Sequence, residues 1–561
     1  MPNFLETILT QLKHADGRVV LREIRGDRFV SVTGRELLDQ IQLVRMFIRS
    51  SSVHPGDRCA LLAANSIRWA VFHLGLMAEG AIVVPLYSRQ APAELAGMMR
   101  NCQPRLIFVS DAALGESVAQ AWPDAPRRVL FDEVVRQSAP QIPLADAPNP
   151  RPDSDVVTII YTSGTSGEPK GVCLTVGNLT HMLSCTTERL DQLMGETHEP
   201  DRVFHYLPFN FAASTILLLS CLARESVLTL STDLNRLAEE IHLVSPNYFL
   251  NVPTLLERVR RGVEEAIAKR PAVIRSLFAR PRTAWQRQHV GRGRALDTFW
   301  LALGRGLIFR KIRERFGTHL RALICGSAPL APETQQFFLM LGIPVLQAYG
   351  LTETAGICTL DDPRVPVEPG CVGTVITGIE MKLAENEEIV VRGPHIFAGY
   401  WNRPEETARV LQDGWFHTGD QGEVNVRGNW RISGRIKNLI ILNSGHNIAP
   451  EPIEEKVARL LPAAQQVVMV GNGRGYLCML VTGEVESAAV QVALDAVNPE
   501  FPHYRQIRNF TIVRDVFTPE SGLLTAMGKI RRDAINARYA SEINAMYDSK
   551  GSREAVSRQH A

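Results

Sequence analysis

Hydrophobic positions between residues 18 and 110 follow two alternating patterns. Residues 66–78 place their large apolar side chains on one face of a predicted helix, because side chains three and four positions apart share a face. Short apolar runs at 82–86 and 106–109 predict buried strands. This alternation of strands and helices predicts a parallel sheet with helices on its faces.

The alternation continues beyond residue 200 and then changes. Further strand candidates lie at 203–207, 227–230, 248–252 and 322–325. Short β segments and turns at 372–431 predict a smaller β unit, and the chain after Arg435 predicts a compact α+β unit of about 110 residues. The predicted fold is α/β: a large N-terminal domain with mostly parallel sheets flanked by helices, a small β subdomain, and a small mobile α+β C-terminal domain.

Length and composition describe a soluble globular protein of two or more packed units. The chain has 561 residues, of which 45% are hydrophobic and 21% charged, and its mean hydropathy is −0.04. Nine cysteines without C-x-x-C spacing argue against a zinc site or a disulfide framework and fit a reducing cytoplasm. We expect no signal peptide and no transmembrane helix, because the longest uncharged stretch, residues 207–223, falls short of the ~20 apolar residues that a span requires.

A basic segment at residues 257–315 carries much of the positive charge. It holds sixteen Lys or Arg against five Asp or Glu, although the net charge of the whole chain is only +2. Its apolar residues recur at spacings compatible with amphipathic helices. Two interpretations stay open: a solvated helical insertion that covers its own neighbours, or a surface for peripheral contact with an anionic membrane. We expect no nucleic acid partner, because no nucleic-acid motif accompanies the charge.

Small, hydroxylated and glycine residues are concentrated at 160–172, after a β-branched run that predicts a strand. Glycines let the backbone approach an anion, hydroxyls donate hydrogen bonds, and Lys170 supplies a charge. The spacing is not that of a P-loop, and a flexible surface turn is the alternative. The segment is predicted to be a phosphate cradle. Its residues are Thr162, Ser163, Gly164, Thr165, Ser166, Gly167 and Lys170.

Four more short motifs follow the cradle along the chain. They are residues 347–354 (QAYGLTET), 414–420 (GWFHTGD), 433–438 (SGRIKN) and 527–532 (MGKIRR). With the cradle, they resemble the adenylate-forming superfamily of acyl-CoA synthetases, luciferases and nonribosomal adenylation domains. The resemblance covers about residues 30 to 535, and chance does not account for five motifs in this order.

The resemblance implies an enzyme that uses ATP and Mg²⁺ to form an acyl-adenylate. It implies that the cradle holds the β- and γ-phosphates, Thr352 touches the α-phosphate, and Asp420 and Arg435 reach the ribose. Glu353 would help to hold Mg²⁺, which suits a carboxylate. Taken singly, Asp420 could cap a turn and Glu353 a helix, but the ordered set favours the functional interpretation. The residues implied to border the adenine are Gly326, Ser327, Ala328, Pro329, Tyr349 and Gly350.

Lys529 resembles the lysine that the family's C-terminal domain brings into the active site. There its ammonium would bridge the acid and the α-phosphate, so its loss should reduce the rate more than substrate binding. A solubilising basic cluster with Arg531 and Arg532 is the alternative. With Thr352 and Lys170, Lys529 completes the predicted catalytic set.

The resemblance also implies a division of the chain. We expect an N-terminal domain at 1–434, a hinge at 435–437 that includes Lys437, a C-terminal domain at 438–545, and a frayed tail at 546–561. Rotation at the hinge would let one chain use two active-site faces in sequence. The residues that would then line the tunnel for CoA are Ser444, Gly445 and His446.

One departure from the family concerns the acid. Many relatives have a histidine where this chain has Phe211, which cannot donate a hydrogen bond to an acyl carboxylate but can wall an apolar tunnel. With Phe209 and Ile216, it forms a predicted acyl pocket without an obvious acidic residue, which favours a fatty or aryl acid over an amino acid. The basic segment is similar in position to an insertion in long-chain fatty acyl-CoA synthetases, so we expect a fatty acid.

Three functions remain open at this point. The first is a cytoplasmic acyl-CoA synthetase whose partners are a fatty acid, ATP and CoA. The second is an acyl-AMP ligase that loads an acyl carrier protein. The third is a nucleotide- or acyl-binding protein without turnover, which Phe211 makes conceivable and the retention of Lys529, Glu353 and Arg435 argues against.

Overall fold

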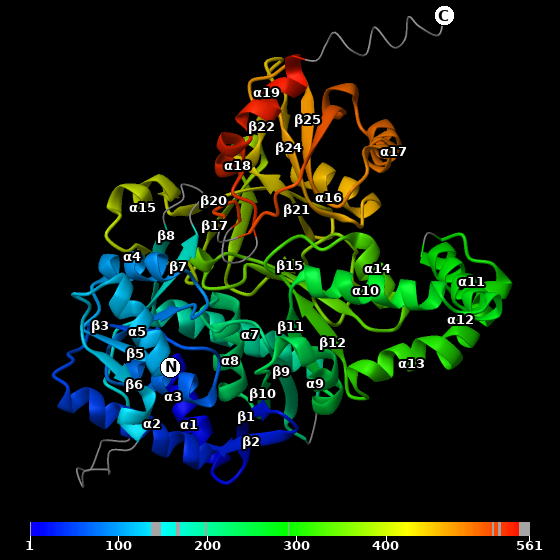
Figure 1. Ribbon diagram of the computed structural model, residues 1–561. Coiled ribbons are helices and arrows are strands. Elements are labelled where there is room, and N and C mark those ends of the chain that lie inside the picture. The colour runs from blue at the N-terminus through cyan, green and yellow to red at the C-terminus, as the bar shows by residue number, and fades with distance from the viewer. Residues whose placement is uncertain are drawn as a thin grey trace, which may run out of the picture.

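The computed structural model describes residues 2–135, 147–163, 169–196, 199–289, 291–518, 521–524 and 529–548. Figure 1 shows a large lower body of sheets and helices, with a smaller unit of orange and red elements above it. The large body contains two sheets with mostly parallel pairings and a smaller antiparallel sheet. The predicted α/β class, with a large N-terminal domain and a smaller α+β C-terminal unit, is therefore confirmed.

A seven-stranded sheet contains the strands predicted nearest to the N-terminus. Its spatial order is β18 (Gly399–Tyr400), β8 (Pro169–Thr175), β7 (Val156–Ser163), β4 (Ile82–Leu86), β3 (Arg58–Leu62), β5 (Leu106–Val109) and β6 (Arg128–Leu130). The pairs from β7 to β6 are parallel, whereas β8 and β18 extend one edge in antiparallel pairing. Buried side chains fill both faces of β4 and β5, which explains their continuous apolar runs.

A nine-stranded sheet carries the later strands. Its order is β15 (Thr374–Val375), β14 (Thr359–Leu360), β13 (Val345–Tyr349), β12 (Ala322–Cys325), β11 (Tyr248–Asn251), β9 (Asp201–His205), β10 (Ser226–Leu230), β1 (Val19–Arg25) and β2 (Arg28–Thr33). The five pairings from β13 to β1 are parallel. Strands β9 to β12 occupy the four segments predicted between residues 203 and 325.

Among the described residues, five helices of more than ten residues share one hydrophobic core with the short helix α6 (Phe131–Val135) and with strands of both large sheets. They are α1 (Phe4–Ala15), α2 (Gly34–Ser50), α3 (Ile67–Ala78), α7 (Val176–Met194) and α8 (Ala212–Ala223). The Ser66 side chain caps α3 by accepting a hydrogen bond from the Trp69 backbone, which explains why the predicted helix begins there. Other helices and 3₁₀ turns of the large body are α4 (Pro92–Cys102), α5 (Ala112–Ala121), α6 (Phe131–Val135), η1 (Leu234–Arg236), α9 (Leu237–Val244), α14 (Pro332–Met340), η4 (Thr352–Thr354) and α15 (Pro404–Val410).

The basic segment is helical, as its spacing predicts. Its elements are α10 (Pro253–Ala268), α11 (Ala272–His289), α12 (Ala295–Gly304), the π-helical turn η2 (Arg305–Phe309), α13 (Arg310–Arg313) and η3 (Glu314–Phe316). Phe278, Trp285, Leu301 and Phe309 are buried in a second hydrophobic cluster. The segment therefore does cover its own neighbours on this side. Figure 1 shows α11 and α12 at the outer edge of the molecule.

The predicted smaller β unit is a five-stranded antiparallel sheet. Its strands are β16 (Glu380–Leu383), β17 (Glu388–Arg392), β19 (Leu411–Gln412), β20 (Trp415–Val424) and β21 (Trp430–Arg435), with η5 (Glu385–Glu387) between the first two. The last strand runs through Arg435, and η6 (Ile436–Asn438) follows it directly.

The C-terminal unit has its own apolar core. Its elements are β22 (Ile440–Ile441), β23 (Asn447–Ile448), α16 (Glu451–Leu460), β24 (Ala464–Val470), β25 (Leu477–Gly483), α17 (Ser487–Val497), η7 (Asn498–Glu500), η8 (His503–Arg505), β26 (Ile507–Val513), α18 (Arg532–Arg538) and α19 (Ala540–Asp548). The predicted hairpin is β24 with β25. The predicted tail began too early: Met546 is buried in α19, and the Tyr547 hydroxyl donates to the carbonyl of Val470. Residues 549–561 lie outside the described residues.

No helix among the described residues has both the length and the apolar character needed to cross a membrane.

Candidate active site

Three separate motifs meet at the buried carboxylate of Asp420. The Tyr349 hydroxyl, at the end of β13, donates to Asp420 Oδ2 over 2.8 Å. Asp420 on β20 faces Arg435 on β21, whose Nε lies 2.8 Å from Oδ1. Burial raises the pKa of Asp420, whereas Arg435 and the Tyr349 hydroxyl act to lower it. The carboxylate thus has both a neutral donor and a cation within contact.

Glu353 is held at the turn that follows β13. Its Oε1 accepts a hydrogen bond from the Tyr400 hydroxyl over 2.8 Å, and its backbone carbonyl accepts one from the Phe397 N–H over 2.9 Å. Burial and the Glu353 charge both raise the pKa of Tyr400, so this hydroxyl stays a donor. A carboxylate that accepts one neutral hydrogen bond keeps lone pairs for a hard cation. Thr352 precedes Glu353 on the same 3₁₀ turn, η4.

Lys170 lies on β8, opposite Thr162 across the β7–β8 hairpin. Its ammonium contacts the Glu406 carboxylate and lies 5.0 Å from the centroid of the Tyr400 ring. Arg403 also donates to Glu406, over 2.6 Å, and hydrogen bonds from Lys170 and Arg403 lower the pKa of Glu406. The sequence motifs include neither Tyr400 nor Glu406.

The pairing of β18 with β8 explains this contact. Tyr400 lies opposite Val172, two residues beyond Lys170, and α15 with Glu406 follows β18 directly. A strand as short as Gly399–Tyr400 has no periodicity that a sequence pattern could detect. Only the sheet order shows that residues 230 positions apart share a site.

Lys529 brings a cation of the C-terminal unit to the same place. Burial of the ammonium is the largest effect and lowers its pKa, and the Arg435 charge lowers it as well. The charges of Asp420 and Glu353 raise the pKa by a smaller amount. The net result is a pKa below the ordinary lysine value. The residue as a whole is nevertheless exposed.

Two small-residue turns follow β12 and β13. Gly350 approaches the backbone of Gly356 so closely that an added Cβ would lie 2.4 Å from its carbonyl oxygen. Gly326 is buried, whereas Ser327 has a left-handed φ of 73°. Ser327, Ala328 and Pro329 are exposed. The turn after β12 is therefore open to solvent at a strand end, where ligands bind in open α/β sheets.

Part of the phosphate cradle lies beyond this description. Thr162 is half-buried near the end of β7, and Ser163 is the last residue of that strand. Gly164, Thr165, Ser166 and Gly167 lie outside the described residues.

Family comparison accounts for both units of the chain. Residues 10–401 match the model of the AMP-binding enzyme family, and residues 437–551 match the AMP-binding enzyme C-terminal domain. The chain belongs to the AMP-binding enzyme family. The resemblance to adenylate-forming enzymes is thereby confirmed.

This AMP-binding enzyme is similar to ligases of long-chain fatty acids. It is 26% identical over 577 residues to "Long-chain-fatty-acid--CoA ligase FadD15" of Mycobacterium bovis, and the match covers 95% of each chain. It is 27% identical to "Long-chain-fatty-acid--[acyl-carrier-protein] ligase AEE15, chloroplastic" of Arabidopsis thaliana, over 95% of this chain and 85% of that one. The fold matches o-succinylbenzoate CoA synthetase from Bacillus subtilis with an acyl-adenylate: the TM-score is 0.74 at 20% identity, over 95% of this chain and 98% of that one.

As a member of this family, the AMP-binding enzyme uses ATP, Mg²⁺ and CoA. The described residues fit these groups. Glu353 offers a carboxylate to Mg²⁺, and Asp420 offers an anchored acceptor to ribose hydroxyls.

The AMP-binding enzyme has an apolar cavity beside the two small-residue turns. Of the three predicted acyl-pocket residues, Ile216 on α8 lies in its wall. The lining residues are Thr186, Leu190, Ala213, Ile216, Leu217, Leu250, Ile324, Gly326, Ser327, Ala348, Gly350, Gly356, Ile357 and Leu360. The cavity therefore joins α8 to the ends of β12 and β13.

Phe209 and Phe211 do not belong to this lining. Phe209 is buried, with its ring centroid 4.9 Å from Trp69 and 5.1 Å from His205. The backbone N–H of Phe209 donates a hydrogen bond to Asn65 Oδ1 over 2.9 Å. Phe209 thus packs against the rings of Trp69 and His205 and lies outside the lining of this cavity, and its place in the acyl pocket stays a prediction. Phe211 is the N-cap residue of α8, and its place opposite the acid stays a prediction.

The predicted CoA residues form the exposed turn between β22 and β23. Gly445 has a left-handed φ of 82°. The Ser444 hydroxyl lies 2.9 Å from His446 Nδ1, and the imidazole stacks on Tyr504 with 4.1 Å between centroids. Lys437 lies on η6, directly after the last strand of the β unit. These contacts give the turn a defined shape, and its assignment to CoA remains a prediction.

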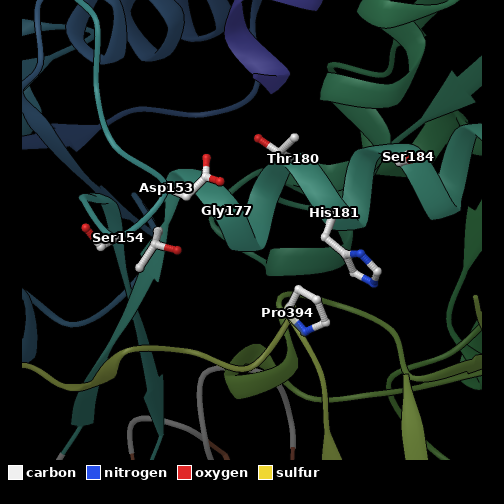
Figure 2. A pocket seen from close by; sticks show the side chains of 8 residues that line it. Asp153, Ser154, Gly177, Thr180, His181, Ser184 and Pro394 are labelled. Atoms are coloured by element: carbon white, nitrogen blue, oxygen red, sulfur yellow. The ribbon is translucent and has the colours of Figure 1, made fainter. Parts of the chain in front are cut away.

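A second, polar pocket lies at the first turns of α7. None of the predicted site residues lines it. Figure 2 labels seven of its lining residues, which are Asp153, Ser154, Gly177, Thr180, His181, Ser184 and Pro394, and Thr175 is the eighth.

Proposed function

We propose that this AMP-binding enzyme activates a fatty acid with ATP, releases pyrophosphate, and transfers the acyl group to CoA as a thioester. The observation that carries the proposal is the apolar cavity between Ile216 and the turns at Gly326 and Gly350. Its lining includes no charged residue, so an apolar chain fits it better than the ammonium of an amino acid. The names of the FadD15 and AEE15 relatives support a long-chain fatty acid.

In the adenylation step, the protein's task is to position two anions and neutralise their charge. Lys170 and the cradle residues would hold the β- and γ-phosphates, and Thr352 would contact the α-phosphate. Glu353 would hold Mg²⁺. Asp420, paired with Arg435, would accept hydrogen bonds from the ribose hydroxyls.

Lys529 would bridge the carboxylate of the acid and the α-phosphate. Its position near Asp420 and Glu353 supports this role, because an ammonium there can stabilise the negative charge that builds in the transition state. After adenylation, rotation at Lys437 would bring the turn of Ser444, Gly445 and His446 to the site, where it would guide CoA.

The test is acid-dependent pyrophosphate release from Mg-ATP with fatty acids of graded length, an aryl acid and an amino acid. We expect release with fatty acids, and an acyl-CoA product when CoA is added. Lys529→Ala should largely abolish release, whereas the neighbouring Arg531→Ala should retain it. Release with the amino acid alone would refute the substrate class, and no release with any acid would refute turnover.

Loading of an acyl carrier protein is a second candidate, favoured by the name of the AEE15 relative. Acyl transfer to a carrier protein without acyl-CoA formation would establish it. We also propose a cytoplasmic location, because all nine cysteines are buried free thiols.

A further inference from the structure

Helix α12 and the turn η2 present large apolar side chains to solvent. Leu296, Phe299 and Leu307 are 69%, 59% and 50% exposed. Their spacings of three and eight residues place them on one helical face, which we term the α12 ridge. Leu301, on another face of α12, is buried in the second hydrophobic cluster. This helix is thus apolar on two sides, and the described chain covers only one of them.

Exposed basic side chains flank the α12 ridge along the chain. Arg292 precedes α12, whereas Arg305, Arg310 and Lys311 follow it, and all four are exposed. Arg310 pairs with Glu314 over 3.3 Å. Within the described residues, the other three cations take part in no ion pair, so their charges are available to an external anion. The excess of positive charge in residues 257–315 therefore reaches the surface beside the ridge.

We propose that the α12 ridge and its flanking cations dock the enzyme on an anionic lipid bilayer. The apolar side chains would enter the boundary between headgroups and acyl chains, and the Arg and Lys side chains would face anionic headgroups. An acidic protein would pair with the charges but would not require an exposed apolar row. The place of α11 and α12 at the outer edge of the molecule leaves the ridge open to a flat surface.

The experiment is co-sedimentation of the full chain with lipid vesicles. We expect binding to phosphatidylcholine vesicles that contain about 30% phosphatidylglycerol, weak binding to pure phosphatidylcholine, and loss of binding as salt rises from about 0.1 to about 0.5 M. A variant with Leu296→Asp, Phe299→Asp and Leu307→Asp should bind at least about tenfold more weakly, because three apolar contacts are removed and the local charge is reduced.

Val426→Asp is the matched control. Val426 is a fully exposed apolar residue between β20 and β21, outside the basic segment, so its variant should bind as the unaltered protein does. Equal binding by the triple variant and the unaltered protein would overturn the proposal. So would a preference of the unaltered protein for an acidic carrier protein over anionic vesicles.

A second triple variant tests the same surface independently, in case the first variant misfolds. Arg292→Glu, Arg305→Glu and Lys311→Glu change only exposed side chains and should also abolish binding; retained binding would overturn the electrostatic part of the proposal. Pyrophosphate release with a short, water-soluble acid should be unchanged in both variants. Vesicle binding does not depend on turnover, so failure of this proposal is distinguishable from failure of the proposed reaction.

Discussion

Replacing Glu406 with Gln removes the carboxylate that contacts the Lys170 ammonium. The two side chains are 16% (Lys170) and 24% (Glu406) exposed, so the pair is more shielded than an ordinary surface ion pair. If Lys170 holds the β- and γ-phosphates, its ammonium must exchange this carboxylate for phosphate oxygens when ATP binds. Glu406 then competes with ATP, and its charge raises the concentration of ATP that the enzyme needs.

The size of this competition follows from the geometry. Two unit charges in contact attract each other by roughly 5 kcal/mol at an effective dielectric constant of about 20, but desolvation and partial exposure reduce the net energy to about 1 kcal/mol. We therefore expect Glu406→Gln to lower KM for ATP about fivefold. The Tyr400 ring, 5.0 Å from the ammonium, still limits its movement, so kcat should fall by less than about threefold.

The assay is pyrophosphate release at saturating acid, with ATP varied. Glu405→Gln is the control, because Glu405 is the adjacent carboxylate on α15, is 88% exposed and pairs only loosely with Arg409, at 3.9 Å. It should leave KM for ATP unchanged. An unchanged or raised KM in Glu406→Gln would refute the competition between Glu406 and ATP for Lys170.

Three further predictions concern the same site and its support. Lys529→Ala should lower kcat by about 10² to 10³, with little change in ATP binding measured by calorimetry, and a change confined to ATP binding would contradict the catalytic role. Gly350→Ala should weaken ATP binding at least about tenfold, because the new Cβ would meet the Gly356 carbonyl, whereas Gly97→Ala, a change in open space on α4, should not. Burial raises the pKa of Asp361 to about 7 in the folded protein. The protonated carboxyl therefore contributes stability that is fully present at pH values below the pKa of the unfolded chain. This contribution is lost as pH rises through about 7. Asp361→Asn keeps an acceptor for the Gln347 N–H and should remove this loss, which urea unfolding would detect as a gain on the order of 3 kcal/mol over the unaltered protein between pH 4 and 8; equal pH dependence in the two proteins would contradict it.

The sequence predicted the central strands well because burial on both faces leaves continuous apolar runs. The strands at 82–86 and 322–325 are examples, and their parallel pairing follows from the helices between them. The contact of Tyr400 and Glu406 with Lys170 could not be predicted. It depends on pairing between β18 and β8, which involves two residues of one strand and backbone hydrogen bonds that carry no side-chain pattern.

The sequence also did not predict the direction in which individual apolar side chains face. Phe209 and Ile216 are both apolar, yet Phe209 packs against Trp69 whereas Ile216 on α8 lines the cavity. The loop that holds Phe209 has no periodicity to show which side faces the core. In the basic segment, one face of α12 is buried and another is exposed. Leu301 covers its neighbours, whereas Phe299, two residues earlier, faces solvent.

The site holds both carboxylates and cations before any substrate is considered. Its carboxylates are Glu353, Asp420 and Glu406, and its cations are Lys170, Arg403, Arg435 and Lys529. ATP adds further negative charge, so we expect a cation of the site to exchange a carboxylate for a phosphate. Asp420 is not the carboxylate to lose its cation: its side chain is 4% exposed, and an unpaired charge there would be costly. Glu406 retains Arg403 and contact with water when Lys170 leaves it. We therefore expect the pair of Lys170 and Glu406 to yield its cation to ATP, whereas Arg435 should stay with Asp420.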